Sequence, residues 1–185
     1  MTDNNRKLSD QQKLELIKEA VKSYPDFPVP GVNFKDLFSV LQNPPIFAIL
    51  NEILVKTAKQ IQPAVECVVG LESRGFLLAP LIALELQIPF VPIRKKGKLP
   101  GKVKSHKYAL EYGQDIVEIQ EGAIKPNEKV LIVDDLLATG GTLNAACQLI
   151  SQVGGNVASC LIVIELLDLK GRDKVSSPIS SLIQY

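Results

Sequence analysis

The sequence lacks an excess of charge of either sign. Its 21 lysines and arginines are matched by 20 aspartates and glutamates, and the formal net charge is +1. A chain this close to neutrality has no long-range field that would attract nucleic acid or an acidic membrane. We therefore expect no nucleic acid and no membrane among its partners. Any charge-dependent chemistry has to come from local groups of residues.

Long apolar runs and leader-like segments are lacking too. The longest apolar run, residues 75–84, contains Pro80 and is far shorter than the roughly 20 residues that a membrane span needs. The first residues of the chain are polar and lack the apolar stretch of a signal peptide. These features predict a soluble, cytoplasmic protein.

Cysteine is scarce, and the three cysteines are Cys67, Cys147 and Cys160. Their odd number and scattered spacing argue against a disulfide framework and against a zinc site. We expect buried free thiols in a reducing compartment.

The apolar residues that are present predict one domain of the α/β class. They make up 46% of the 185 residues, enough for a single large core. Their periodicity predicts helices over residues 8–21, 44–61, 75–87 and 139–155. Continuous apolar runs predict strands over residues 66–71, 89–94, 129–135 and 156–167. Such an alternation indicates a mostly parallel central sheet with helices on both faces.

Two segments are expected to lie outside this sheet. Residues 24–36 carry several prolines and a glycine, which predicts an ordered loop rather than an element. Residues 94–126 are basic at first and then strand-like, which predicts a mobile loop followed by a small hairpin. Loops of this length in a compact domain are usually lids or binding elements.

Polar residues follow three of the predicted strands, in the runs 72–74, 94–96 and 134–135. Ligands of open parallel sheets bind at the carboxyl ends of the strands, near the point where the strand order reverses. We therefore expect the three runs to form one site.

The stretch VLIVDDLLATGGTLNAA, residues 130–146, has the pattern of a strand, a glycine turn and a helix N-terminus. It matches neither the Walker A pattern nor G-x-G-x-x-G. The backbone N–H groups at such a turn bind anions, and hydrogen bonds to a charged group contribute about 1.5–3 kcal/mol each. Asp134 and Asp135 would accept hydrogen bonds from vicinal hydroxyls, so the stretch predicts a ribose 5-phosphate site. The alternative is that the two aspartates only cap the helix.

At this point the residues carry a family resemblance. VLIVDDLLATGGT, residues 130–142, resembles the phosphoribosyl-pyrophosphate (PRPP) signature of type I phosphoribosyltransferases. The blocks YPDFPVPGVNFKD, GLESRGFLLAP, IRKKGKLPG, YALEYG and IELLDLKGR resemble adenine phosphoribosyltransferases in the same order and spacing. The resemblance covers nearly the whole chain. It implies the type I phosphoribosyltransferase fold as a single domain over residues 1–185, with a helix and hood at about 1–40 and a lid loop at about 95–113.

The resemblance implies a reaction between adenine and PRPP that gives AMP and pyrophosphate, catalysed by a homodimer. It also implies Mg²⁺ as the cofactor, held mainly by substrate phosphates and water rather than directly by the protein. The alternatives are a PRPP-binding regulator, a catalytically weak paralogue and an enzyme for another base. We expect too few residues before position 24 for a DNA-binding module.

The resemblance also implies which residues bind PRPP. Asp134 and Asp135 would hold the ribose hydroxyls. The 5′-phosphate would lie on the turn formed by Ala138, Thr139, Gly140, Gly141 and Thr142. Pyrophosphate would be bound by two runs of polar residues, namely Ser73, Arg74, Arg94, Lys95 and Lys98. The alternative for the second run is an ordinary basic loop or a nucleic-acid patch.

For catalysis, the resemblance implies Glu111 and Tyr112 on the lid, together with Arg74. Glu111 is the candidate acceptor of the N9 proton of adenine, although the sequence alone shows only an acid in a strand-like run. His106, the only histidine, matches no motif of the family and is expected to be a solvated loop residue.

Adenine would be bound by Val32, Phe34 and Lys35 from the first loop and by Leu166 from the last strand. In the family an aromatic ring and a leucine enclose the purine, and Phe34 and Leu166 are the matching positions. The alternative for Phe34 is a core aromatic that anchors the loop. Many family members have Arg where Lys35 stands, and often Asp where Glu72 stands.

Overall fold

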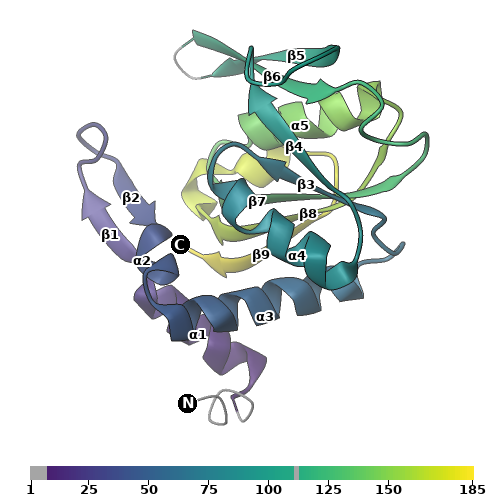
Figure 1. Cartoon of the computed structure of the whole chain (residues 1–185). Helices are drawn as coiled ribbons and strands as arrows, with labels where there is room; N and C mark the ends of the chain where they lie inside the picture. Colours follow the sequence, from purple (N-terminus) through teal and green to yellow (C-terminus); the bar gives the residue numbers. More distant parts are fainter. Residues whose placement is uncertain (1–7, 111–112) are drawn as a thin grey trace. The chain divides into compact units, whose positions relative to one another are not determined.

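The structure is a computed structural model that describes residues 8–110 and 113–185. The chain divides into two compact units, one up to Lys56 and one from Thr57 onward (Figure 1). We describe each unit by itself.

The first unit consists of helices and a short hairpin. Its elements are α1 (Asp10–Ala20), β1 (Lys22–Pro25), β2 (Asn33–Asp36), α2 (Phe38–Leu41) and most of α3 (Pro44–Gln60). Ser9 caps α1, because its Oγ accepts a hydrogen bond from the Gln12 backbone N–H at 3.2 Å while its own N–H donates to Gln12 Oε1 at 2.9 Å. The helices predicted over 8–21 and 44–61 are confirmed, and α3 opens on proline as expected.

The prediction of a loop over residues 24–36 is wrong in part. β1 and β2 form an antiparallel hairpin in which Tyr24 is paired with Phe34. The prolines do not prevent pairing, because Pro28 and Pro30 lie in the connection and Pro25 is the last residue of β1. The rings of Phe27 and Phe34 also meet edge to face, with centroids 5.2 Å apart.

The second unit contains a seven-stranded sheet in the order β5-β6-β4-β3-β7-β8-β9 (Figure 1). The strands are β3 (Cys67–Leu71), β4 (Phe90–Lys95), β5 (Val103–Leu110), β6 (Gly113–Gln120), β7 (Lys129–Leu137), β8 (Asn156–Glu165) and β9 (Ile179–Gln184). The five strands β4, β3, β7, β8 and β9, which are adjacent in this order, are parallel to one another. β6 is antiparallel to both of its neighbours, β4 and β5. The predicted mostly parallel sheet is confirmed.

Two helices of the second unit cover opposite faces of the sheet, as Figure 1 shows. Helix α4 (Ala79–Leu86) connects β3 to β4, and helix α5 (Gly141–Gln152) connects β7 to β8. The two connections lead away from the sheet centre in opposite directions. Because such connections are right-handed, they place their helices on different faces. The strand order therefore reverses between β3 and β7, where ligands of this class of sheet bind.

The buried face of the sheet supplies the core. All five residues of β3 are buried, and the surrounding cluster includes Val130, Ile132 and Leu149. The three cysteines are buried free thiols, as predicted. Burial raises the pKa of the Cys67 thiol to about 12, so this thiol is unreactive near neutral pH. Within the ranges that the structure describes, no helix is both long and apolar enough to cross a membrane.

Three boundaries differ from those that the sequence predicts. The predicted helix 75–87 is split into a 3-10 turn, Arg74–Leu77, and α4, because Pro80 near the start of α4 has no N–H to continue the first turn. β7 continues two residues past Asp135, since it pairs with β8 as far as Leu137. β5 begins at Val103, so much of the predicted loop is a strand.

Candidate functional site

The three polar runs predicted to form one site lie at neighbouring strands of the second unit. β3 lies between β4 and β7 and is parallel to both, with Leu71 paired to Ile93 and Gly70 paired to Val133. The carboxyl ends of the three strands therefore lie at one edge of the sheet, as predicted.

The first link between these runs joins the ends of β3 and β7. Arg74 Nε lies 2.6 Å from Asp135 Oδ2, and the Asp135 side chain is almost fully buried at 7% exposure. The Arg74 side chain is 23% exposed, so one part of it neutralises the buried carboxylate while another part can still face a ligand.

A second link joins β3 to β4. Arg94 donates from Nε and Nη2 to the two carboxylate oxygens of Glu72, at 3.2 and 3.1 Å, and the Lys95 backbone N–H donates to Glu72 Oε2 at 3.0 Å. Hydrogen bonds from Arg94 hold the pKa of Glu72 below its usual range. Arg94 also donates from Nη1 to the Lys98 backbone oxygen at 3.1 Å. The glutamate side chain of Glu72 is long enough to reach Arg94 with both oxygens. Ser73 is exposed between these two links.

Asp134 and Asp135 lie within β7 and do not cap α5. The N-cap of α5 is Gly140, and no side chain makes a capping hydrogen bond there. Burial and the neighbouring Asp135 carboxylate raise the pKa of Asp134 well above its usual value. Burial also raises the pKa of Asp135, against the opposing charge of Arg74. The capping alternative is therefore wrong, and the two carboxylates are held under electrostatic strain that hydroxyl donors would relieve.

The turn over residues 138–142 depends on glycine. Gly140 has a φ of +79°, and a Cβ placed on it would lie 2.2 Å from the Gly171 backbone oxygen. A Cβ on Gly171 would lie 2.1 Å from the Ala138 backbone oxygen. Only glycine allows the two backbones to approach this closely. The twelve-residue helix α5 starts at Gly141, within the turn.

Gly171, in the 3-10 segment Gly171–Lys174 that follows β8, supports the turn and was not among the predicted site residues. Its neighbour Arg172 donates from Nε and Nη2 to the two oxygens of the buried Glu165, at 2.9 and 2.7 Å. These bonds lower the pKa of Glu165 to about 2. The only sequence signal was the KGR within the block IELLDLKGR, which carries no local pattern that would place Gly171 beside Ala138.

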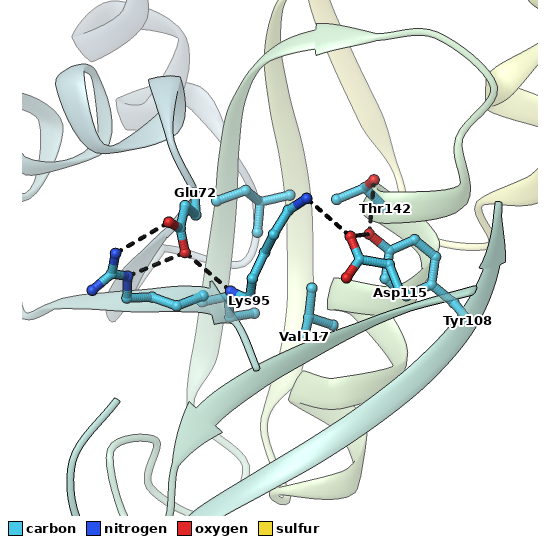
Figure 2. A pocket seen from close by; sticks show the side chains of 9 residues that line it. Glu72, Lys95, Tyr108, Asp115, Val117 and Thr142 are labelled. Atoms are coloured by element: carbon cyan, nitrogen blue, oxygen red, sulfur yellow. Dashed lines mark hydrogen bonds and ion pairs between the residues drawn. The ribbon is translucent and has the colours of Figure 1, made fainter. Parts of the chain in front are cut away.

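A cavity of about 190 Å³ lies beside these groups, and Figure 2 shows it from close by. Its lining combines residues at the ends of β3 and β4 and at the start of α5 with side chains from the antiparallel hairpin β5–β6. The lining residues are Leu71, Glu72, Ile93, Arg94, Lys95, Tyr108, Asp115, Val117 and Thr142. Tyr108 and Asp115 were not among the predicted site residues. Tyr108 lies in the block YALEYG, which is the only signal that could have indicated it.

The predicted catalytic pair Glu111 and Tyr112 lies outside the described residues, and in the sequence it separates β5 from β6. His106 is not a loop residue, contrary to our expectation. It lies on β5, is half-buried, and its Nδ1 is 2.8 Å from Gln152 Nε2 on α5. Thus His106 links the hairpin to the helix.

The predicted adenine residues are divided between the two units. In the first unit, Val32 is 40% exposed, Phe34 is half-buried against Phe27, and Lys35 Nζ donates to Ser23 Oγ at 2.8 Å. In the second unit, Leu166 directly follows β8 and is half-exposed. Phe34 is therefore not a core aromatic within its own unit.

In the part of the chain that the structure describes, no group of three or more His, Cys, Asp or Glu side chains could enclose a metal ion. The carboxylates at the sheet edge are Asp134, Asp135 and Glu72, and both oxygens of Glu72 accept hydrogen bonds from Arg94. An ion such as Mg²⁺ fits this donor set only if substrate oxygens and waters complete its coordination.

Comparison with known proteins identifies the family. The family model of the phosphoribosyl transferase domain matches residues 38–182. Adenine phosphoribosyltransferase of Drosophila pseudoobscura pseudoobscura is 49% identical over 178 residues, which are 96% of this chain and 98% of that protein. The adenine phosphoribosyltransferase of Homo sapiens is 45% identical over 94% of this chain and 97% of its own length.

Solved structures agree with this match. The Saccharomyces cerevisiae adenine phosphoribosyltransferase, solved with an imino-altritol bisphosphate and adenine, has a TM-score of 0.87 and 40% identity over 94% of this chain and 99% of its own. The Trypanosoma brucei enzyme, solved with AMP, pyrophosphate and ribose-5-phosphate, has a TM-score of 0.86 and 29% identity over 96% of this chain and 82% of its own. The chain therefore belongs to the phosphoribosyltransferase family, and the relatives that it matches over nearly their full length are adenine phosphoribosyltransferases.

Proposed function

We propose that the protein is an enzyme of purine salvage that transfers the 5-phosphoribosyl group of PRPP to N9 of adenine and forms AMP and pyrophosphate. One observation carries the proposal. A glycine turn at a helix N-terminus, two strained carboxylates and the cationic side chains of Arg74, Arg94 and Lys95 lie at one edge of the sheet. The chain also matches an adenine phosphoribosyltransferase over 96% of its length. A ribose that carries a 5′-phosphate and a pyrophosphate on C1′, as in PRPP, offers a partner for each of these groups.

The turn and the aspartates would bind the ribose 5-phosphate half of PRPP. Backbone N–H groups of the turn, with the hydroxyls of Thr139 and Thr142, donate to the 5′-phosphate. Asp134 and Asp135 accept hydrogen bonds from the ribose 2′- and 3′-hydroxyls. Because these bonds stabilise the ionised carboxylates, PRPP binding lowers the raised pKa of Asp134.

The cations would bind the pyrophosphate half, from two sides. Arg74 and Ser73 follow β3, while Arg94, Lys95 and Lys98 lie at the end of β4 and beyond it. In the reaction the bond from C1′ to the pyrophosphate oxygen breaks and its electron pair leaves with pyrophosphate. The bond from N9 to C1′ forms on the other side. Cations fixed around the leaving group stabilise the charge that develops on it.

The N9 proton has to pass to an acceptor when the new bond forms. We assign this role to Glu111, with Tyr112 beside it on the connection between β5 and β6. The same carboxylate would face the cationic ribosyl carbon in the transition state and stabilise it electrostatically.

The residues that we propose for adenine are Val32, Phe34 and Lys35 in the first unit and Leu166 in the second. The edge-to-face contact with Phe27 holds the Phe34 ring in one orientation, which favours stacking on a flat base. Lys35 Nζ is held by Ser23, so the backbone of Lys35 rather than its ammonium is the part we expect to contact the base.

Mg²⁺ is the proposed cofactor, and it would neutralise charge on the phosphates of PRPP when bound. We propose that the ion is held mainly by substrate oxygens and water, and that Asp134 and Asp135 interact with it through water.

We also propose a homodimer in the cytoplasm. The family resemblance supports the dimer, and Leu77 and Leu84 are large apolar side chains of the second unit that are 41% and 78% exposed. Three free cysteines suit a reducing compartment. The molar mass in solution, measured by light scattering, tests the dimer, and a monomer at micromolar concentration would contradict it.

Turnover distinguishes the enzyme from a sensor that only binds PRPP. The protein should convert PRPP and adenine to equal amounts of AMP and pyrophosphate when Mg²⁺ is present, and stop when the ion is chelated. Tight PRPP binding without AMP formation would replace the enzyme with a binding protein.

A further inference from the structure

Three of the four cations that we assign to pyrophosphate are already paired with a carboxylate. Arg74 is paired with Asp135, Arg94 with Glu72, and Lys95 with Asp115. The first two acids belong to the strand ends that form the site. Asp115 does not, because it lies on β6 of the hairpin and has no role in the reaction as described so far.

Asp115 is placed by contacts on three sides, which Figure 2 shows in part. Its Oδ2 lies 3.1 Å from Lys95 Nζ and 3.5 Å from the Tyr108 hydroxyl, and its Oδ1 accepts from the Ile116 backbone N–H at 2.8 Å. Tyr108 is the direct cross-strand partner of Asp115, so the pair fixes the carboxylate over the end of β4. The Tyr108 hydroxyl also lies 3.3 Å from Thr142 Oγ1, at the turn assigned to the 5′-phosphate.

The charges of Asp115 and Lys95 stabilise each other. Burial alone would raise the pKa of Asp115, but the Ile116 N–H and the Lys95 ammonium hold it below its usual range. The hydrogen bond and charge of Asp115 in turn raise the pKa of Lys95. Both groups are therefore ionised near neutral pH. The Lys95 side chain is 62% exposed, so its ammonium can leave the carboxylate without crossing packed side chains.

We propose that Asp115 is an internal anion that holds the Lys95 ammonium in the empty enzyme and competes with pyrophosphate and PRPP for it. The proposal rests on the pyrophosphate assignment of Lys95 made under the proposed function. Asp115 acts through Lys95 and is a positioning residue. When the polyphosphate is bound, Lys95 turns from Asp115 to a phosphate oxygen. When pyrophosphate leaves, Asp115 takes the ammonium back.

The competition lowers affinity for both ligands that carry a pyrophosphate group and leaves adenine affinity unaffected. Removing the carboxylate in Asp115→Asn should therefore lower the Kd for pyrophosphate and the KM for PRPP by about two- to fivefold, the size expected for one largely exposed ion pair. Product inhibition by pyrophosphate should increase by the same factor. A purely structural role would instead weaken binding or change the KM values for both substrates.

The test is calorimetric titration of the full chain with inorganic pyrophosphate and Mg²⁺ at about 0.15 M salt, where the screening length is about 8 Å and remote charges matter little. Glu121→Gln is the matched control. It removes one carboxylate just past β6, from an exposed side chain that makes no ion pair among the described residues. We expect tighter binding for Asp115→Asn and unchanged binding for Glu121→Gln. Unchanged or weaker binding by Asp115→Asn overturns the proposal, and so does an equal gain in the control.

A second variant and a crystal structure test the proposal independently of Asp115→Asn. Asp115→Ala removes the same carboxylate and replaces Asp115→Asn if that variant does not fold. A crystal structure of the pyrophosphate complex should show Lys95 Nζ on a phosphate oxygen and out of contact with Asp115. Lys95 still on Asp115, without a phosphate contact, would overturn the proposal. Failure of the proposed function would be a separate result. It would appear as a lack of AMP formation by the unaltered protein, regardless of the pyrophosphate affinities of the variants.

Discussion

Arg74 Nε and Asp135 Oδ2 lie 2.6 Å apart, and this ion pair joins the turn after β3 to the carboxyl-terminal part of the longer neighbouring strand β7. The pair connects the residues assigned to pyrophosphate with those assigned to the ribose. It also keeps a nearly buried carboxylate neutralised when no substrate is present. The same contact therefore serves the stability of the empty enzyme and the placement of its ligand.

Replacing Arg74 separates these two effects. Arg74→Ala leaves Asp135 buried without this partner, so we expect a loss of about 1–3 kcal/mol in the free energy of unfolding together with a large loss of kcat/KM for PRPP. Urea unfolding measures the free energy of unfolding, and steady-state kinetics measure kcat/KM. In Arg74→Ala/Asp135→Asn stability should recover, because the buried Asp135 charge that lost its partner is removed as well, while activity should not. Recovery of activity with stability would show that Arg74 only supports the fold.

Asp134 should lower the folding stability of the ligand-free protein although it contributes to PRPP binding. Its pKa is raised in the folded state, so the stability that this group contributes is present below the pKa of the unfolded chain and is lost as the pH rises through the folded value. At pH 7, Asp134→Asn should therefore raise the melting temperature of the ligand-free protein by about 2–4 °C. PRPP binding should weaken in the same variant, because Asn accepts hydrogen bonds from hydroxyls less strongly than a carboxylate. A lower melting temperature would contradict this account of Asp134.

Gly171 should be required for the shape of the turn. A Cβ on this residue would lie 2.1 Å from the Ala138 oxygen, which forces the turn to shift. We expect Gly171→Ala to raise the KM for PRPP at least tenfold, about 1.4 kcal/mol of lost binding, with little change in the KM for adenine. Asp173→Ala, an exposed substitution in the same short 3-10 segment, is the control. Equal KM values for Gly171→Ala and the control would show that the close approach is not needed.

The ion pair between Glu165 and Arg172 should make the folding stability depend on pH in the acidic range. Arg172 lowers the pKa of Glu165 to about 2, below the usual value of a glutamate. The stability from this pair is therefore present above the unfolded pKa and is lost as the pH falls from about 4.5 towards 2. With the exposed side of Arg172 taken into account, we expect a loss of about 1–3 kcal/mol over that window. Urea unfolding between pH 6 and pH 3 should show a shallower dependence for Glu165→Gln, and parallel curves for the two proteins would contradict the assignment.

The stretch around residues 130–146 shows how much the sequence could predict. A strand, a glycine turn and a helix are all local features, and the structure has each of them. The meeting of three strand ends was also predictable, because alternating strands and helices leave few arrangements of a parallel sheet. Thus the sheet, its helices and the edge that carries the site followed from local patterns.

Other features depend on contacts between distant residues and leave no local pattern. Gly171 meets Ala138 only because β8 pairs with β7 up to its end. Asp115 meets Lys95 only because the hairpin adds to the edge of β4. The hairpin over residues 22–36 was missed for a related reason, since prolines signal a loop although here they lie where β1 ends and in the connection.

The central claim is transfer of a phosphoribosyl group to adenine, and the most direct measurement is base selectivity. PRPP and Mg²⁺ are supplied with adenine, hypoxanthine, guanine or uracil in parallel, and nucleotide and pyrophosphate are quantified together. The account predicts AMP and pyrophosphate in equal amounts from adenine and at least a hundredfold slower reaction of the other bases, about 2.7 kcal/mol of discrimination. Turnover of another base in preference to adenine, or of none while PRPP binds, would contradict it.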